Sequence, residues 1–457
     1  MKHLFYFRLF TCLISRGHHL TISLSIRALL SGAGSPLSGR LRPLCLLFAL
    51  TLVCPLSLLS QENSYEITHR MPTFFEAMKG QLTYPLAWGR SDIRNFEAWK
   101  SRAREVVLDC LQLLPPPPGQ WNLIIEATER RIPTNESSLT ATERRELIIE
   151  ATERRKGVES KEGETGRSYT AHRISFNLSA WSRVKGYLLV PEGEGPFPAV
   201  VLLHDHGAHF SIGKEKLVRP FGVSEAVAED ARQWVDKCYD GSFVGDSLAA
   251  RGYVVLSVDA LFWGDRGCEG GSQYDMQQAL ASNLMQMGSS WASVIHADDM
   301  RSAEFLASLT YVDRERIGCL GFSMGAYRSW MLSALSEVVK VSASICWMND
   351  TDHLMTLNNN QNKGGSAFSM LVPGLRRYLD YPHVAAIACP KPALFFNGTR
   401  DKLFPIEGVE EAYRHLRSVW KEQGADGLLV TRLWDEKHFF NRAMQQEVFR
   451  FFDHFLR

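Results

Sequence analysis

The sequence has almost no excess of charge of either sign. Its 457 residues include 51 Lys and Arg against 50 Asp and Glu, for a formal net charge of +1. Proteins that bind nucleic acids usually carry a basic tail or a basic face, and no basic tail is present. The charge balance therefore argues against a general nucleic-acid-binding function.

Paired cysteine motifs are also missing. The chain has nine Cys, none in a Cys-x-x-Cys spacing, and three of them fall within the first 60 residues. A domain of this size does not need disulfides to be stable. We predict that the other six are mostly buried and reduced: Cys110, Cys238, Cys268, Cys319, Cys346 and Cys389.

A long apolar run that could span a membrane is lacking. The run from Leu44 to Leu59 follows Arg40 and Arg42, is short for a bilayer span and contains Pro55. A basic start, an apolar stretch and a small residue at its end resemble a secretory signal peptide. We predict a leader over residues 1–60, with the signal peptide at about 40–60, and a secreted or periplasmic protein.

Two further regions precede the main domain. Between Ser91 and Leu114 the apolar residues recur at helical spacing, and prolines follow, which predicts a helical cap over 61–120. The nine residues Leu123–Arg131 then recur identically as Leu147–Arg155. So short a charged repeat cannot build a solenoid, and we predict a surface excursion over 121–170.

From residue 171 to the end, apolar strands alternate with helical patterns. This pattern predicts an α/β fold with an eight-stranded, mostly parallel sheet covered by helices on both faces. The first two strands are joined by a short turn and form an antiparallel hairpin. The predicted strands are 174–178, 184–190, 199–203, 254–258, 317–320, 341–346, 393–396 and 428–434.

A Gly-x-Ser-x-Gly motif, Gly321 to Gly325, lies between the fifth strand and a helical pattern. Such a strand–turn–helix raises the serine hydroxyl above the carboxyl end of the sheet. The first amides of the helix then point toward the group that the serine attacks. The motif predicts Ser323 as a nucleophile and the Met324 amide as an oxyanion donor.

Two later strand ends supply an acid and a base. Asp401 follows the seventh strand and His438 follows the eighth, so the chain order is Ser, Asp, His. His438 would take the serine proton and return it to the leaving alcohol, and Asp401 would orient the imidazole. Asp350 and Asp352, after the sixth strand, are competing acids.

The third strand ends in the segment His204-Asp205-His206-Gly207-Ala208-His209. An HxHxDH zinc cluster would need an Asp where Ala208 stands, so no metal is predicted. A loop of small residues here can bring a backbone amide to the nucleophile, and Ala208 is the predicted second oxyanion donor. His206 and His209 are candidate substrate contacts.

From about Arg173 onward the chain resembles the α/β-hydrolase superfamily, and more narrowly its dienelactone hydrolase and acetyl xylan esterase-like group. Dienelactone hydrolases use a cysteine nucleophile, whereas Ser323 stands here. The resemblance implies an esterase for short acyl groups, often on carbohydrate, with no cofactor; Trp263 is a further candidate substrate contact. The segments that carry it are Leu203–Ala208, Val258–Gly267, Gly321–Gly325, Asn397–Asp401 and Lys437–His438.

The predicted function is that of a secreted serine esterase acting on a small-molecule or polysaccharide ester, with residues 351–390 covering the pocket. A serine peptidase of the prolyl-oligopeptidase kind shares the fold, but the chain has no room for its propeller. A non-catalytic hydrolase-like module that binds glycan or protein is the alternative from another class. The acyl group, the alcohol and the oligomeric state are left open.

Overall fold

A computed structural model describes residues 74–133, 166–356 and 367–457. All of them lie in the larger of two compact units of the chain, residues 68–457. The predicted leader and signal peptide, and the second copy of the repeat, fall outside the described residues. Within the described part, no helix is long and apolar enough to cross a membrane.

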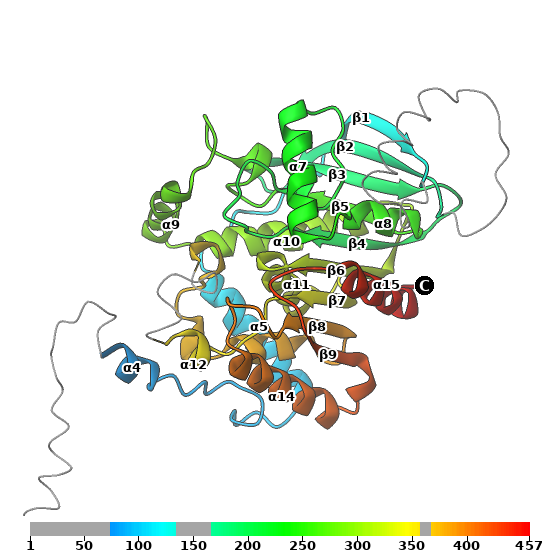
Figure 1. Cartoon of the computed structure of the whole chain (residues 1–457). Coiled ribbons are helices and arrows are strands. Elements are labelled where there is room, and N and C mark those ends of the chain that lie inside the picture. Colours follow the sequence, from blue (N-terminus) through cyan, green and yellow to red (C-terminus); the bar gives the residue numbers. More distant parts are fainter. Residues whose placement is uncertain (1–73, 134–165, 357–366) are drawn as a thin grey trace, which may run out of the picture. The chain divides into compact units, whose positions relative to one another are not determined.

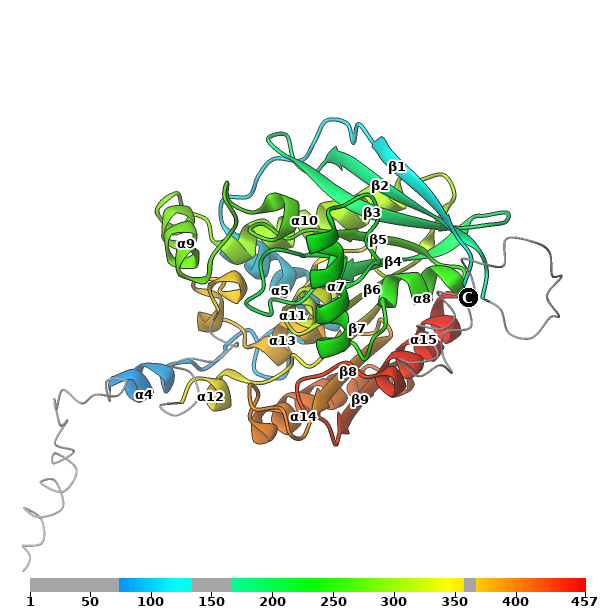
Figure 2. The ribbon, with the colours of Figure 1, turned by 45° about the horizontal axis from the view of Figure 1, so that its top comes forward.

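The centre of the described unit is one nine-stranded sheet (Figures 1 and 2). Its strand order is β1-β2-β3-β5-β4-β6-β7-β8-β9. The strands from β4 onward run parallel to one another, and β1, β2 and β3 pair antiparallel. The strands are β1 (Ile124–Arg131), β2 (Tyr169–Asn177), β3 (Arg183–Pro191), β4 (Phe197–Leu203), β5 (Val254–Val258), β6 (Val312–Phe322), β7 (Val341–Ile345), β8 (Ala393–Gly398) and β9 (Leu429–Trp434).

Helices cover both faces of the sheet because its central strands are apolar on both sides. In β4, Val200 and Leu202 pack into one hydrophobic cluster and Ala199 and Val201 into another. Helices α7, α8 and α15 contribute to the first cluster, and α10 and α11 pack on the other face. The helices are α4 (Phe74–Lys79), α5 (Phe96–Leu111), α7 (Glu225–Cys238), α8 (Val244–Ala250), α9 (Gln277–Gln286), α10 (Trp291–Ala307), α11 (Met324–Leu335), α12 (Thr351–Leu354), α13 (Tyr381–Ala385), α14 (Ile406–Glu422) and α15 (Arg442–Leu456).

All eight predicted strands are present, but the predicted count is wrong by one. The ninth strand is β1, which is the first copy of the repeat that we placed in a surface excursion. It pairs with β2 at the edge of the sheet (Figure 2). Its last residue, Arg131, is buried and donates to Asp246 at 2.6 Å, an ion pair that joins the edge strand to α8.

Helix α5 lies where helical spacing was found between Ser91 and Leu114. The side chain of Asn95 caps its first turn by accepting from the Ala98 amide. Its buried residues, such as Trp99 and Val107, belong to the same cluster as those of α11. The six cysteines of the described residues are free, and four of them, Cys110, Cys319, Cys346 and Cys389, are buried.

The segment 351–390 contains α12, short 3₁₀ turns and α13. Residues 357–366 within it lie outside the described residues. Leu379, Val384 and Ile387 are fully buried in the cluster that also contains α11 and α14. The second half of this segment is therefore part of the core.

Candidate active site

The turn at Ser323 joins β6 to α11 at the centre of the sheet. Ser323 has φ 57° and ψ −125°, a conformation that non-glycine residues seldom adopt. A Cβ on Gly321 would lie 2.7 Å from the Gly325 Cα, and one on Gly325 would lie 2.8 Å from the carbonyl carbon of Leu203. Both positions therefore require glycine, and the close approach sets the start of α11 against the end of β4.

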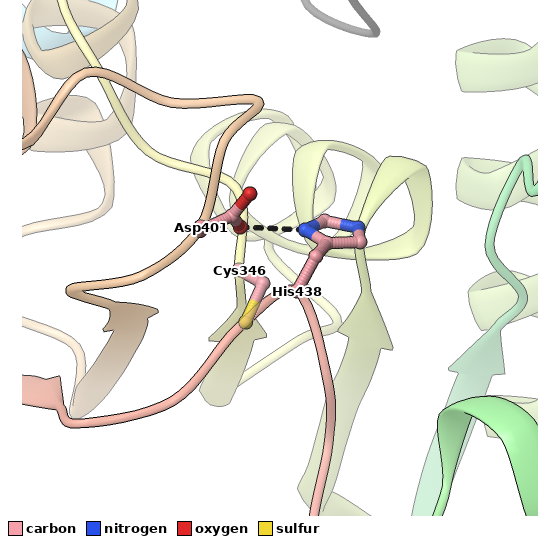
Figure 3. Close-up of side chains that lie close together, drawn as sticks. All are labelled: Cys346, Asp401 and His438. Atoms are coloured by element: carbon pink, nitrogen blue, oxygen red, sulfur yellow. Dashed lines mark hydrogen bonds and ion pairs between the residues drawn. The ribbon is translucent and has the colours of Figure 1, made fainter.

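Ser323, His438 and Asp401 form a hydrogen-bonded chain. The His438 Nε2 lies 2.8 Å from the Ser323 Oγ. On the other side of the ring, the His438 Nδ1 lies 2.6 Å from Oδ2 of Asp401 (Figure 3). The Asp401 side chain is buried and also accepts from the Leu403 amide at 2.9 Å. A carboxylate on Nδ1 leaves Nε2 to accept the serine proton, which is the arrangement that activates a hydroxyl nucleophile.

Of the three acids considered, Asp401 is the one that contacts His438. Asp350 is instead the N-cap of α12, where it accepts from the backbone amide of His353 at 2.9 Å. Its carboxylate also lies 2.7 Å from the His353 Nδ1. The Asp350 side chain is thus engaged elsewhere.

Cys346 lies beside the acid and the base (Figure 3). Its thiol, the His438 ring and the Asp401 carboxylate are near enough together to be considered as metal ligands. Burial, with a smaller contribution from Asp401, raises the pKa of the Cys346 thiol, and a metal would need the thiolate. The His438 Nδ1 is already taken by Asp401. The three groups therefore suit acid–base chemistry better than metal binding.

The loop after β4 differs from its prediction at Ala208. The Ala208 amide donates to Nδ1 of His206 at 2.9 Å, so it is not available to an oxyanion. Since Nδ1 accepts, the proton of the ring is on Nε2, which lies 3.1 Å from the Gln277 Oε1. Burial lowers the pKa of His206 to about 4, which keeps the ring neutral. His206 thus has both nitrogens engaged within the protein.

Lys216 holds the carbonyls of this loop. Its Nζ donates to the Asp205 oxygen at 3.1 Å and to the His206 oxygen at 3.2 Å. In a trans peptide the N–H points opposite to the C=O, so the amides of His206 and Gly207 point away from the ammonium group. Neither amide has a hydrogen-bond partner among the described residues.

Sequence reasoning missed the buried charged residues that support this loop. Three consecutive charged residues, Lys214, Glu215 and Lys216, would ordinarily indicate a solvated surface, yet all are buried. Lys214 lies 2.7 Å from both Asp259 and Asp265, and Asp205 accepts from the Tyr239 hydroxyl at 2.6 Å. The partners are distant in sequence, so no local signal could have identified them.

The other two predicted substrate contacts, His209 and Trp263, pack against groups of the protein. The His209 Nε2 is 2.6 Å from Asp230 of α7, and its ring stacks on Trp234 of the same helix at 4.7 Å. Trp263 is fully buried, donates to the His206 oxygen and stacks on Trp291. The prediction that Trp263 contacts substrate is therefore wrong, because its ring completes the core beneath the loop.

With this geometry in view, comparison with known proteins gives a consistent result. The model of a family described as "Abhydrolase family" matches residues 196–419. This match and the mostly parallel sheet with helices on both faces show that the described part of the chain has the α/β-hydrolase fold.

Several individual proteins are similar to the chain. YtaP of Bacillus subtilis strain 168, a hydrolase candidate, is 28% identical over 284 residues, which are 62% of this chain and 87% of that protein. An acetyl xylan esterase candidate from Bacteroides fragilis superposes with a TM-score of 0.55 at 15% identity, covering 82% of this chain and 86% of the other. A glucuronoyl esterase from Solibacter usitatus superposes with a TM-score of 0.52 at 12% identity, covering 78% and 93%.

Proposed function

We propose that this protein is a secreted serine esterase that cleaves short acyl esters of carbohydrate. The observation that carries the proposal is the chain of hydrogen bonds from Ser323 through His438 to Asp401. Two structural neighbours that share the fold are esterases by name, one for acetyl xylan and one for glucuronoyl esters. Together these support an ester hydrolase with a carbohydrate-borne substrate.

In the proposed reaction, the Ser323 Oγ attacks the ester carbonyl while His438 Nε2 takes its proton. The C–O bond to the alcohol then breaks, and His438 returns the proton to the leaving oxygen. Water, deprotonated by His438 in turn, attacks the acyl-serine. The bond between the acyl carbon and the Ser323 Oγ breaks, the acid leaves, and His438 returns the proton to the Ser323 Oγ. Asp401 keeps the imidazole in the required tautomer and stabilises the imidazolium.

The negative charge on the ester oxygen needs two donors. Met324 is the first residue of α11, so its amide has no partner within the helix and is one donor. In place of Ala208, we propose the amide of His206 or Gly207 as the second donor. The Lys216 ammonium binds the carbonyl oxygens of both peptides, so both amides point away from it. Residues 351–356 and 367–378 remain the proposed cover of the pocket.

The test is the pair of variants Ser323→Ala and Ser418→Ala. Ser418 is an exposed serine of α14 and serves as the control. We expect Ser323→Ala to lose hydrolysis of an aryl acetate and labelling by a fluorophosphonate while its circular dichroism is unchanged, and Ser418→Ala to match the wild type. Turnover retained by Ser323→Ala would refute the nucleophile.

A substrate panel then separates the finer alternatives. Acetylated polysaccharides, aryl esters of graded chain length and a peptide substrate would be compared with the same enzyme preparation. We expect acetyl esters to be preferred and the peptide to be inert. Preferential cleavage of the peptide would overturn the esterase proposal.

A further inference from the structure

A second surface feature of the described residues lies at the turn between β2 and β3. A groove of about 660 Å³ is lined there by Gln120, Asn122, Asn177, Trp181 and Arg183, among others. Trp181 is 71% exposed, the highest value among the large hydrophobic side chains described. Tryptophan is enriched at binding interfaces because its ring offers a large apolar surface together with a hydrogen-bond donor.

The turn that carries Trp181 is held firmly. The amides of Leu178 and Ser179 both donate to the Ser182 oxygen, at 2.9 and 3.1 Å. The Ala180 amide donates to the oxygen of Pro116 at 2.9 Å, which ties the turn to the other wall of the groove. The indole is therefore presented to solvent on an ordered backbone, which lowers the entropic cost of binding.

Arg183 forms the polar side of the groove. Its guanidinium donates to the Asn177 side-chain oxygen at 2.6 Å and to the Asn122 backbone oxygen at 3.0 Å. It also donates to the Ser175 hydroxyl at 3.2 Å, and no acidic side chain pairs with it among the described residues. Its Nε and one Nη1 hydrogen are unused, so a fixed and uncompensated positive charge faces the groove.

The strand register places this turn on the same edge of the sheet as Ser323. Gly186 of β3 pairs with Val258 at the carboxyl end of β5, so the residues of β3 before Gly186 extend beyond that edge. β3 is separated from β6, which leads to Ser323, by β5 and β4. Three strand spacings put the turn about 14 Å to the side of the nucleophile.

We propose that this groove binds the glycan chain that extends from the esterified sugar, with Trp181 stacked on a sugar ring and Arg183 bound to a uronate carboxylate. A sugar ring has an apolar face for the indole and hydroxyls for the amides beside it. The lateral offset is one that a short run of sugar residues spans. The inference rests on the proposed function, because it takes the substrate to be a carbohydrate ester.

The kinetic test uses the mature enzyme and the variants Trp181→Ala, Trp181→Phe and Tyr274→Ala. Tyr274 is 69% exposed and does not line the groove, so its variant is the matched control. On acetylated glucuronoxylan we expect Trp181→Ala to raise KM roughly 5- to 10-fold, with kcat and aryl acetate hydrolysis unchanged. Trp181→Phe should recover most of the affinity, and Tyr274→Ala should match the wild type.

A binding test separates this inference from the proposed function. Affinity electrophoresis of Ser323→Ala in gels with glucuronoxylan or neutral arabinoxylan measures glycan binding without turnover. We expect stronger retardation by glucuronoxylan, lost when Trp181→Ala is added. An enzyme without esterase activity that still shows this retardation would refute the function and leave the groove assignment intact.

Equal retardation of Ser323→Ala with and without Trp181→Ala would overturn the inference. Equal KM values of the wild type and Trp181→Ala on acetylated glucuronoxylan would do the same. Both results leave the esterase proposal standing. Light scattering provides the remaining outcome. A dimer that Trp181→Ala dissociates would show the groove to be an interface between copies of the chain, which also overturns the proposal.

Discussion

The variant Gly325→Ala tests how closely α11 must approach β4. A Cβ at this position would collide with the Leu203 carbonyl oxygen, its nearest neighbour, and would lie 2.8 Å from the Leu203 carbonyl carbon and 3.1 Å from the His204 oxygen. Carbon atoms in contact normally stay about 3.5–4.0 Å apart. The start of α11 would therefore have to move by more than about 1 Å from β4, because the atoms it meets belong to the backbone.

This displacement should reduce activity far more than stability. Overpacking lowers the free energy of unfolding by about 1–3 kcal/mol, and replacing glycine by alanine within a helix raises it by about 1 kcal/mol. The net loss of about 0–2 kcal/mol leaves the protein folded. Ser323 and the loop after β4 flank the moved residue, however, and a misplacement of about 1 Å near the reacting atoms lowers the rate about 100-fold.

The assay compares kcat for an aryl acetate, the rate of fluorophosphonate labelling and the melting temperature. Gly427→Ala is the control, since a Cβ there meets no heavy atom within 4 Å. We expect both rates to fall about 100-fold for Gly325→Ala and to stay unchanged for Gly427→Ala. A Gly325→Ala enzyme within about threefold of wild-type activity, far from the expected 100-fold loss, would show that the close approach does not position the nucleophile.

Three further predictions concern charge. His438→Gln should reduce kcat nearly as much as Ser323→Ala, and Asp401→Asn by about 10⁴-fold, measured on the aryl acetate; near-normal turnover of Asp401→Asn would mean that another carboxylate serves His438. Chelators should leave activity unchanged. Activity that a chelator removes and zinc restores would contradict the conclusion that Cys346, Asp401 and His438 do not form a metal site. His296 is buried, neither of its nitrogens has a partner among the described residues, and burial lowers its pKa to about 3. Below pH 6.5 only the unfolded chain gains this proton, so the free energy of unfolding should fall by up to about 1.4 kcal/mol per pH unit between about pH 6.5 and 3. His296→Phe should make the free energy of unfolding, measured by urea titration, depend less on pH. An unchanged pH dependence would contradict the assignment of this effect to His296.

The arrangement of strands could be predicted wherever a strand is central and apolar. β5 was predicted with its observed bounds, Val254–Val258, because burial on both faces leaves a continuous apolar run. β1 was missed because it is an edge strand whose side chains are mostly exposed, so it lacks that run. Its place depends on pairing with β2 and on the ion pair of Arg131 with Asp246.

The candidate site divides in the same way. Ser323, Asp401 and His438 could be nominated from sequence because each follows a strand, and parallel strands end at one edge of a sheet. Ala208 and Trp263 were assigned wrongly because the backbone turn at Ala208 and the packing around Trp263 are set by the three-dimensional fold. The Ala208 amide faces a ring two residues earlier, and Trp263 fills the core below the same loop.

By itself the sequence determined eight of the nine strands, in order, and the three polar residues at strand ends, since apolar period and glycine spacing are local properties. The tertiary structure alone decided which acid meets His438, which amides remain free and that Lys214 to Lys216 are buried. These outcomes depend on contacts between residues far apart in the chain. A charged group is solvated or buried according to whether the fold brings it a partner, and no local pattern contains that information.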